Sequence, residues 1–249
     1  MKRFILRSAF LAFGLVASAA QAAGGGAKLE HAPINLGDKD SLQRGAHLFV
    51  NYCMSCHAIS YMRYQRIADD LGFSEKDMRK NLMFAGEKIH EPMTVAMPKD
   101  QSAQWFGRTP PDLSTVSRSR GNDWLYTYLK SFYLDDARPW GVNNTVFKDV
   151  GMPHVLWELQ GWQKPVVRKV NLAYGTSKEV TELELIEGTG SMTPAEYDQA
   201  IGDLVNFMAY VGEPAKRTRL IMGWFVLGFL AILLFFAYRL KKEYWKDVH

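Results

Sequence analysis

Apolar residues recur at helical spacing at the start of the central part of the chain. The spacing predicts a helix that begins at Asp40 or Ser41, because both residue types are favourable N-caps. One stripe of this helix is apolar or small, as a buried face requires, and consists of Leu42, Gly45, Phe49 and Cys53. Since Gly45 has no side chain, we expect another helix to approach closely at that position.

A second, longer helix is predicted near the end of the central part. Thr193-Pro194-Ala195-Glu196 has the pattern of a capping box with proline at the first helical position. Glu213-Pro214 ends the helix, because proline disfavours continuation of the helix through the residue before it. The apolar stripe expected to be buried consists of Ile201, Leu204, Val205, Met208 and Val211.

Between these two helices the pattern is less regular. A charged amphipathic segment covers residues 67–82 with an interruption at Gly72, and another helix is expected over residues 122–133. Residues 85–108 are polar, with prolines that indicate loops. Residues 134–190 contain turn residues and a small predicted hairpin, 166–172 with 180–186, but no long helix. The pattern therefore predicts a mainly α domain with long loop insertions.

Two apolar runs lie outside this domain. Residues 9–20 follow the basic N-terminus and precede Ala20-Gln21-Ala22, which predicts a secretory signal peptide over residues 1–22, with an uncleaved anchor helix as the alternative. Residues 220–238 are 19 residues without a charge, and at ~1.5 Å per residue they match the roughly 30 Å hydrocarbon thickness of a membrane. A buried helix in a soluble core is the alternative there. We therefore expect an exported domain over residues 23–215, and a transmembrane anchor (about 220–238) with a short cytoplasmic tail within 216–249.

The basic character of the whole chain, with a pI near 8.9, comes from its two ends. Residues 23–215 contain 20 Lys and Arg against 24 Asp and Glu, so the predicted exported domain is formally negative. This charge argues against nucleic-acid binding and favours a basic protein partner. Candidate docking carboxylates are Asp69, Asp70, Glu75, Asp77 and the acidic residues of segment 179–187.

Cys53-Met54-Ser55-Cys56-His57 has the spacing of a c-type haem attachment site, in which two thiols bind the porphyrin and the histidine ligates iron. A thioredoxin-like redox pair would need a preceding strand, whereas the preceding segment has a helical pattern. A structural zinc site would need further ligands at paired spacing, and the chain has only two cysteines and no such histidine pair. We therefore predict one covalent haem c, attached through Cys53 and Cys56 with His57 as a metal ligand.

The second axial ligand decides whether the haem transfers electrons or reacts with small molecules. Methionines in loops after the motif are the candidates, namely Met93, Met97 and Met152, with His154 as a bis-histidine alternative. Met152 ranks first because Gly151 and Pro153 flank it and define a turn. The residues alone leave this choice open.

Thr109-Pro110-Pro111-Asp112-Leu113-Ser114 is the second informative segment. A ligating histidine needs an acceptor for its other ring N–H, and the rigid Pro111 carbonyl is a candidate, although an ordinary loop before a helix has the same pattern. The following Arg118-Ser119-Arg120 would neutralise haem propionates or simply form a solvated basic face.

Together, these motifs resemble the cytochrome c1 family, the haem-bearing subunits of cytochrome bc1 complexes. The resemblance rests on the haem motif, Pro110 to Ser114, Arg118 with Arg120, Gly151-Met152-Pro153, and Glu213-Pro214 before a C-terminal membrane helix. It implies a class I cytochrome c core in which Gly45 crosses the last helix of the domain near Tyr210. It also implies that Met152 is the axial ligand and that Arg120 contacts a propionate. Residues 101–106 depart from the Asn/Ala-rich segment common in the family, so no propionate contact is carried over to them.

The resemblance implies electron transfer from a Rieske iron–sulfur protein to a soluble cytochrome c, within quinol oxidation coupled to proton translocation. The chain would be an electron-transfer subunit beside cytochrome b, without catalysis of its own. Its expected place is the bacterial inner membrane, single-pass, with the haem domain in the periplasm. The alternatives are a stand-alone anchored cytochrome c that feeds a terminal oxidase, a five-coordinate haem enzyme or sensor, and a thiol oxidoreductase.

Overall fold

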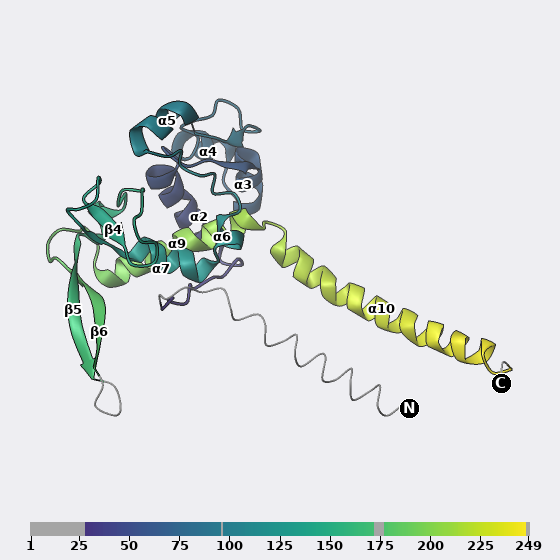
Figure 1. The fold of residues 1–249 in the computed structure, drawn as a ribbon. Helices are drawn as coiled ribbons and strands as arrows, with labels where there is room; N and C mark the ends of the chain where they lie inside the picture. The colour runs from purple at the N-terminus through teal and green to yellow at the C-terminus, as the bar shows by residue number, and fades with distance from the viewer. Residues whose placement is uncertain (1–27, 96, 172–176, 248–249) are drawn as a thin grey trace.

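The computed structural model describes residues 28–95, 97–171 and 177–247, so the predicted signal peptide lies outside the described residues. Short helices and three two-stranded sheets surround a pair of crossing helices (Figure 1). The helices are α2 (Lys39–Leu48), the π-helix η2 (Phe49–Cys53), α3 (Tyr64–Leu71), α4 (Glu75–Asn81), α5 (Lys99–Phe106), α6 (Val116–Ser119), α7 (Asn122–Lys130), α8 (Trp157–Gln160), α9 (Pro194–Gly212) and α10 (Lys216–Tyr244). The strands are β1 (Ile59–Arg63), β2 (Pro92–Met93), β3 (Phe132–Leu134), β4 (Val142–Asn144), β5 (Gln163–Asn171) and β6 (Ser177–Leu185). A mainly α domain with long insertions was the fold expected from the sequence.

The N-cap predicted for α9 is confirmed, whereas the N-cap predicted for α2 is not. Helix α9 begins with the predicted capping box, in which Thr193 and Glu196 bond each other's backbone N–H groups. Helix α2 begins earlier than predicted, because the Asp38 side chain accepts from the Ser41 N–H at 3.0 Å. Asp38 rather than Asp40 or Ser41 is therefore the N-cap.

Helices α2 and α9 cross each other (Figure 1), and Gly45 lies at the point of closest contact. A Cβ atom at Gly45 would lie 2.1 Å from the Asp203 carbonyl oxygen and 2.7 Å from Phe207 Cβ. The prediction that Gly45 lies at a helix crossing is confirmed, but the contacts are with Asp203 and Phe207, about two turns and one turn before Tyr210. Arg44 also joins the helices, since its Nε donates to Asp203 Oδ2 at 2.6 Å.

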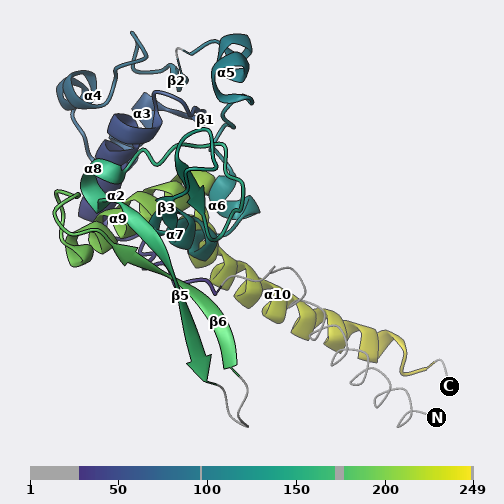
Figure 2. The same ribbon diagram turned by 60° about the vertical axis from the view of Figure 1, so that its left-hand side comes forward.

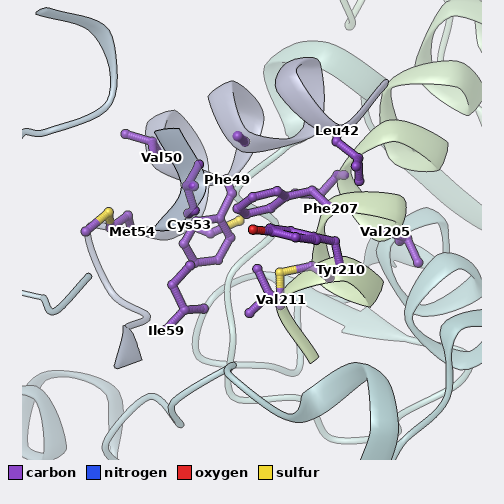
Figure 3. Close-up of a cluster of buried hydrophobic side chains, with 14 of the residues drawn as sticks. Leu42, Phe49, Val50, Cys53, Met54, Ile59, Val205, Phe207, Tyr210 and Val211 are labelled. Atoms are coloured by element: carbon purple, nitrogen blue, oxygen red, sulfur yellow. The ribbon is translucent and has the colours of Figure 1, made fainter. Parts of the chain in front are cut away.

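The main core fills the space around this crossing. Figure 3 shows Phe49, Phe207 and Tyr210 between α2 and α9, and the Phe49 and Phe207 rings are 5.8 Å apart. The predicted stripe of α9 is buried as expected, from Ile201 to Val211. Buried Cys53 belongs to the same cluster, so the end of η2 that carries the haem motif is anchored in the core.

A second hydrophobic cluster lies beside the main core. It consists of Tyr128, Phe132, Val142 and Val150, with Met152 packed against it. Helix α7 ends at Lys130 rather than near Tyr133, because Phe132–Leu134 pairs antiparallel with Val142–Asn144. Strand pairing with a segment ten residues later therefore overrides the helical pattern.

The remaining segments confirm most of the pattern. The amphipathic segment forms α3 and α4, with Gly72 at positive φ between them, whereas α5 lies in a segment predicted to be irregular. Strands β5 and β6 form the predicted hairpin, which projects from the body of the domain (Figure 2). Ion pairs Lys164–Glu184 and Arg168–Glu182 join its strands at 3.3 and 3.1 Å.

Helix α10 leaves the domain as a single long helix (Figure 1). It spans 29 residues, is long and apolar enough to cross a membrane, and none of its apolar window is buried in the chain. Its large apolar side chains from Leu220 to Tyr238 are exposed on the surface of the described structure. This exposure fits a membrane anchor and not the core helix of a soluble protein.

We predict that Gly45→Ala destabilises the domain. The added methyl group clashes with the backbone of α9, and overpacking of this kind costs about 1–3 kcal/mol, more than the roughly 1 kcal/mol gained in helix propensity. The measurement is thermal unfolding of the full chain in detergent, with Gly223→Ala as the control because nothing lies within 4 Å of Gly223. Equal stability of the two variants would show that the crossing is looser than described.

Candidate functional site

The haem motif faces a large apolar cavity. Its larger part has an empty volume of about 1130 Å³, and an adjoining part of about 540 Å³ shares six lining residues with it. Apolar side chains line most of this space, as they do in ligand and cofactor sites. The shared lining residues come from the motif, from the loop before α6 and from the loop after β4: Cys53, His57, Arg108, Pro111, Gly151 and Met152.

His57 is fixed at the wall of this cavity. Its backbone N–H bonds the Cys53 carbonyl at 2.8 Å, and its Nδ1 lies 2.8 Å from the Pro111 carbonyl oxygen. A carbonyl only accepts, so Nδ1 carries the proton and Nε2 keeps its lone pair. Burial lowers the pKa of His57, which favours the neutral imidazole that ligates metals.

The Pro111 carbonyl is itself held by a clamp between the loop before α6 and the segment after the motif. Asp112 Oδ2 accepts from the Ser60 N–H at 3.0 Å and from its hydroxyl at 2.7 Å, while Asp112 Oδ1 accepts from the Ser114 N–H at 2.8 Å. The Leu113 N–H adds a bond to the Ala58 carbonyl at 2.8 Å. Burial by itself would raise the pKa of Asp112, but the bonds from Ser114 and Ser60 outweigh it and hold the pKa below its usual value.

Cys53 does not have the character of a redox-active thiol. Cys53 is buried, and burial together with the neighbouring Cys56 raises its pKa to about 12. Redox-active thiols of the C-x-x-C type have lowered pKa values, because the thiolate is the nucleophile. Among the described residues, no group of three or more His, Cys, Asp or Glu side chains is placed to hold a metal ion.

Met152 lines the same cavity as His57 and is held in place by packing. Met152 contacts the cluster of Tyr128 and Val150, and its Sδ lies 3.4 Å from the Tyr128 hydroxyl. The loop before it is tied by Asn143, whose Oδ1 accepts from the Asp149 N–H at 2.9 Å. Part of the long insertion after residue 134 therefore positions Met152.

The other candidates for the sixth ligand lie elsewhere. Met93 is 1% exposed and belongs to the main core, and Met97 does not line either part of the cavity. His154 is stacked against Phe132 at 4.9 Å, away from the cavity lining. Of the four candidates, Met152 is the one that the fold brings together with His57.

Two arginines supply positive charge at the cavity. Arg120 lines it and lies over the Trp124 ring at 5.2 Å, whereas Arg118 lies 3.9 Å from Glu213 at the end of α9. Arg108 lines both parts and was not predicted, because it lies in a segment with no recognised pattern. Of the predicted pair Arg118 and Arg120, only Arg120 lines the cavity. The second arginine at the cavity is Arg108.

These features fit a c-type haem. The lining is largely apolar, as a porphyrin requires, and the two arginines equal its two carboxylates in number and are opposite to them in charge. The motif supplies two sulfur atoms beside a histidine with one free ring nitrogen. The aromatic and aliphatic lining from α7 and α9 was only partly visible in the sequence; it includes Trp124, Leu125, Tyr128, Leu129, Leu204, Val205 and Met208.

Several of the candidate docking carboxylates are engaged within the chain. Asp70 bonds Arg66 at 2.6 Å and the Tyr210 hydroxyl at 2.7 Å. Glu75 pairs with Arg79 at 2.7 Å. These partners partly neutralise the acidic residues of α3 and α4, so they are weaker candidates for long-range attraction than the sequence indicates.

Comparisons with known proteins agree with this geometry. A family model described as the Cytochrome C1 family matches residues 30–248. A cytochrome c1 from Allochromatium vinosum is 49% identical over 249 residues, 100% of both chains. A protein from Nitrosomonas europaea named ammonia monooxygenase gamma subunit is 46% identical over 249 residues, 100% of this chain and 99% of that one. A protein from Bradyrhizobium diazoefficiens named cytochrome b/c1 is 26% identical over 251 residues, 87% of this chain and 34% of that one.

We predict that Asp112→Asn weakens the clamp in a pH-dependent way. The pKa of Asp112 is lower in the folded chain, so its stabilisation is present above the unfolded value of about 3.9 and is lost as the pH falls through the folded value. At neutral pH we expect the free energy of unfolding to fall by about 0.5–1.5 kcal/mol, and the difference from wild type to vanish in acid. The measurement is unfolding as a function of pH. Asp69→Asn is the control, because Asp69 is an exposed residue of α3 outside the clamp. An equal effect of both variants would contradict the clamp.

Proposed function

This chain belongs to the cytochrome c1 family, and we propose that it accepts electrons from a Rieske iron–sulfur protein and passes them to a soluble cytochrome c. Membership of the family makes it an electron-transfer protein of the cytochrome bc1 complex with a covalent c-type haem. The proposal concerns the donor and the acceptor on either side of that haem, within quinol oxidation coupled to proton translocation. The chain acts as an electron-transfer subunit and not as a catalyst by itself.

The observation that carries the proposal is that His57 and Met152 line one cavity beside Cys53 and Cys56. We assign Cys53 and Cys56 as the attachment sites, and His57 and Met152 as the iron ligands. A haem with this His/Met ligation exchanges one electron at a raised potential and leaves no open position for small molecules. The Tyr128 contact and the loop bonds hold Met152 in place for that role.

The surrounding residues orient these ligands. The Pro111 carbonyl accepts a hydrogen bond from His57 Nδ1–H and so fixes the tautomer and the plane of the ring. Hydrogen-bond partners of metal-ligating histidines usually have this function. Arg120, beside the cavity, is assigned to a propionate, and its place over Trp124 limits its motion. Arg108 is the second cation available to the propionates.

We also assign the division and orientation of the chain. Residues 1–22 are the signal peptide, 23–215 the periplasmic haem domain, and 216–249 the anchor with a cytoplasmic tail, so that the chain crosses the bacterial inner membrane once. Helix α10 supplies the span, and its exposed apolar surface fits lipid and the membrane helices of cytochrome b. The relative whose name joins cytochrome b to c1 supports cytochrome b as the partner.

One relative favours a second candidate function. The protein from Nitrosomonas europaea bears the name of a monooxygenase subunit and matches almost the whole chain. A monooxygenase subunit would copurify with other monooxygenase subunits, and a stand-alone anchored cytochrome would purify without cytochrome b. The partners that copurify with this chain therefore separate the three functions.

We predict that the chain, purified from detergent-solubilised membranes, copurifies with cytochrome b and a Rieske protein. Addition of a quinol should reduce its haem, because electrons reach it through the Rieske protein, and a soluble cytochrome c should reoxidise it. The measurement is the absorbance of the reduced haem with time, with a quinol-site inhibitor as the control.

Reduction that persists with the inhibitor would contradict transfer through the complex. Purification without cytochrome b would favour the stand-alone cytochrome, and purification with monooxygenase subunits would favour the second candidate.

A further inference from the structure

We propose that Tyr128 tunes the potential of the haem through a hydrogen bond from its hydroxyl to the sulfur of Met152. The two atoms, Tyr128 Oη and Met152 Sδ, lie 3.4 Å apart. The inference rests on the proposed function, because it takes Met152 as the iron ligand. It adds a positioning residue that no motif in the sequence indicates.

The Tyr128 hydroxyl has one hydrogen-bond partner among the described residues, which is Met152 Sδ. Tyr128 is only 9% exposed. The ring stacks on Trp124 at 4.8 Å with an interplanar angle of 9°, and Phe132 meets its edge at 5.2 Å. These contacts on two sides prevent the ring from turning away, so the hydroxyl stays directed at the sulfur.

The acceptor is held as firmly as the donor. The Tyr128 carbonyl accepts from Asn144 Nδ2 at 2.8 Å, which ties α7 to the start of the loop that leads to Met152. Asn144 Oδ1 in turn accepts from the N–H groups of Val146 and Phe147 at 2.9 and 3.1 Å. These hydrogen bonds through the buried Asn144 side chain connect the helix that carries the donor to the loop that carries the acceptor.

A thioether sulfur has two lone pairs, so it can accept a hydrogen bond from the tyrosine hydroxyl and still ligate iron. The O–H group draws electron density from the sulfur, and a poorer donor to iron disfavours the oxidised, more positive state. The cavity lining is largely apolar, and a hydrogen bond is electrostatically stronger in such surroundings than in water. The hydrogen bond should therefore raise the potential.

The test is Tyr128→Phe in the intact complex, with the midpoint potential measured by redox titration. Phenylalanine keeps the ring and its stacking, so only the hydroxyl is lost. We expect the equilibrium to shift toward the oxidised state by about threefold to tenfold, which corresponds to a potential lower by roughly 30–60 mV at ~59 mV per tenfold change for one electron. The absorption band of the methionine–ferric iron bond should also shift.

Tyr126→Phe is the matched control on the same helix. Its hydroxyl bonds Asp198 at 2.5 Å and it does not line the cavity, so its loss should leave the potential unchanged. An unchanged potential in Tyr128→Phe, or equal shifts in both variants, would overturn the inference.

A parallel Met152→Leu variant separates this inference from the proposed function. If it opens the iron to carbon monoxide while Tyr128→Phe changes nothing, Met152 is the ligand and only the role of Tyr128 fails. If Met152→Leu keeps the native spectrum and potential, the ligand assignment itself fails and the inference fails with it.

Discussion

The hydrogen bond between His57 Nδ1 and the Pro111 carbonyl joins two segments that are 54 residues apart, and the arrangement of the site depends on it. Proline offers a carbonyl on a stiff backbone, and the Asp112 bonds to Ser60 and Ser114 prevent that backbone from drifting. The imidazole is therefore held in one tautomer, with the Nε2 lone pair available to a metal ion. Loss of this bond would leave a ring free to rotate beside a large cavity.

The rest of the domain serves to hold two walls around that ring. The crossing of α2 and α9 fixes the wall with the haem motif, and only glycine at position 45 allows the close contact with Asp203 and Phe207. The second hydrophobic cluster and the loop after β4 form the other wall and place Met152 at the cavity. An insertion with no helical pattern thus has a definite task, which is to place Met152 and to join it to α7.

Features that depend on residues close together in the sequence were predicted well. The capping box at Thr193, the break at Gly72, the hairpin and the C-terminal apolar helix each depend on local chemistry. Features that depend on distant partners were predicted less well. Asp38 is the N-cap of α2, α7 ends early because the next residues pair as a strand, and α5 forms where prolines predicted loops.

In the site, the motif indicated His57, and the turn around Met152 made it the leading ligand candidate. Arg108 and Tyr128 could not be identified from the sequence, because only the fold brings them to the cavity.

We propose that His57 and Met152 would both bind the haem iron, so that the haem would transfer electrons and leave no position for small molecules. The most direct measurement is the absorption spectrum of the dithionite-reduced, intact complex before and after exposure to carbon monoxide, read at this haem. With both positions filled by protein ligands, carbon monoxide should not bind and the spectrum should remain unchanged. Rapid formation of a carbon monoxide adduct at this haem in the native protein would contradict the account, because it would show an open sixth position.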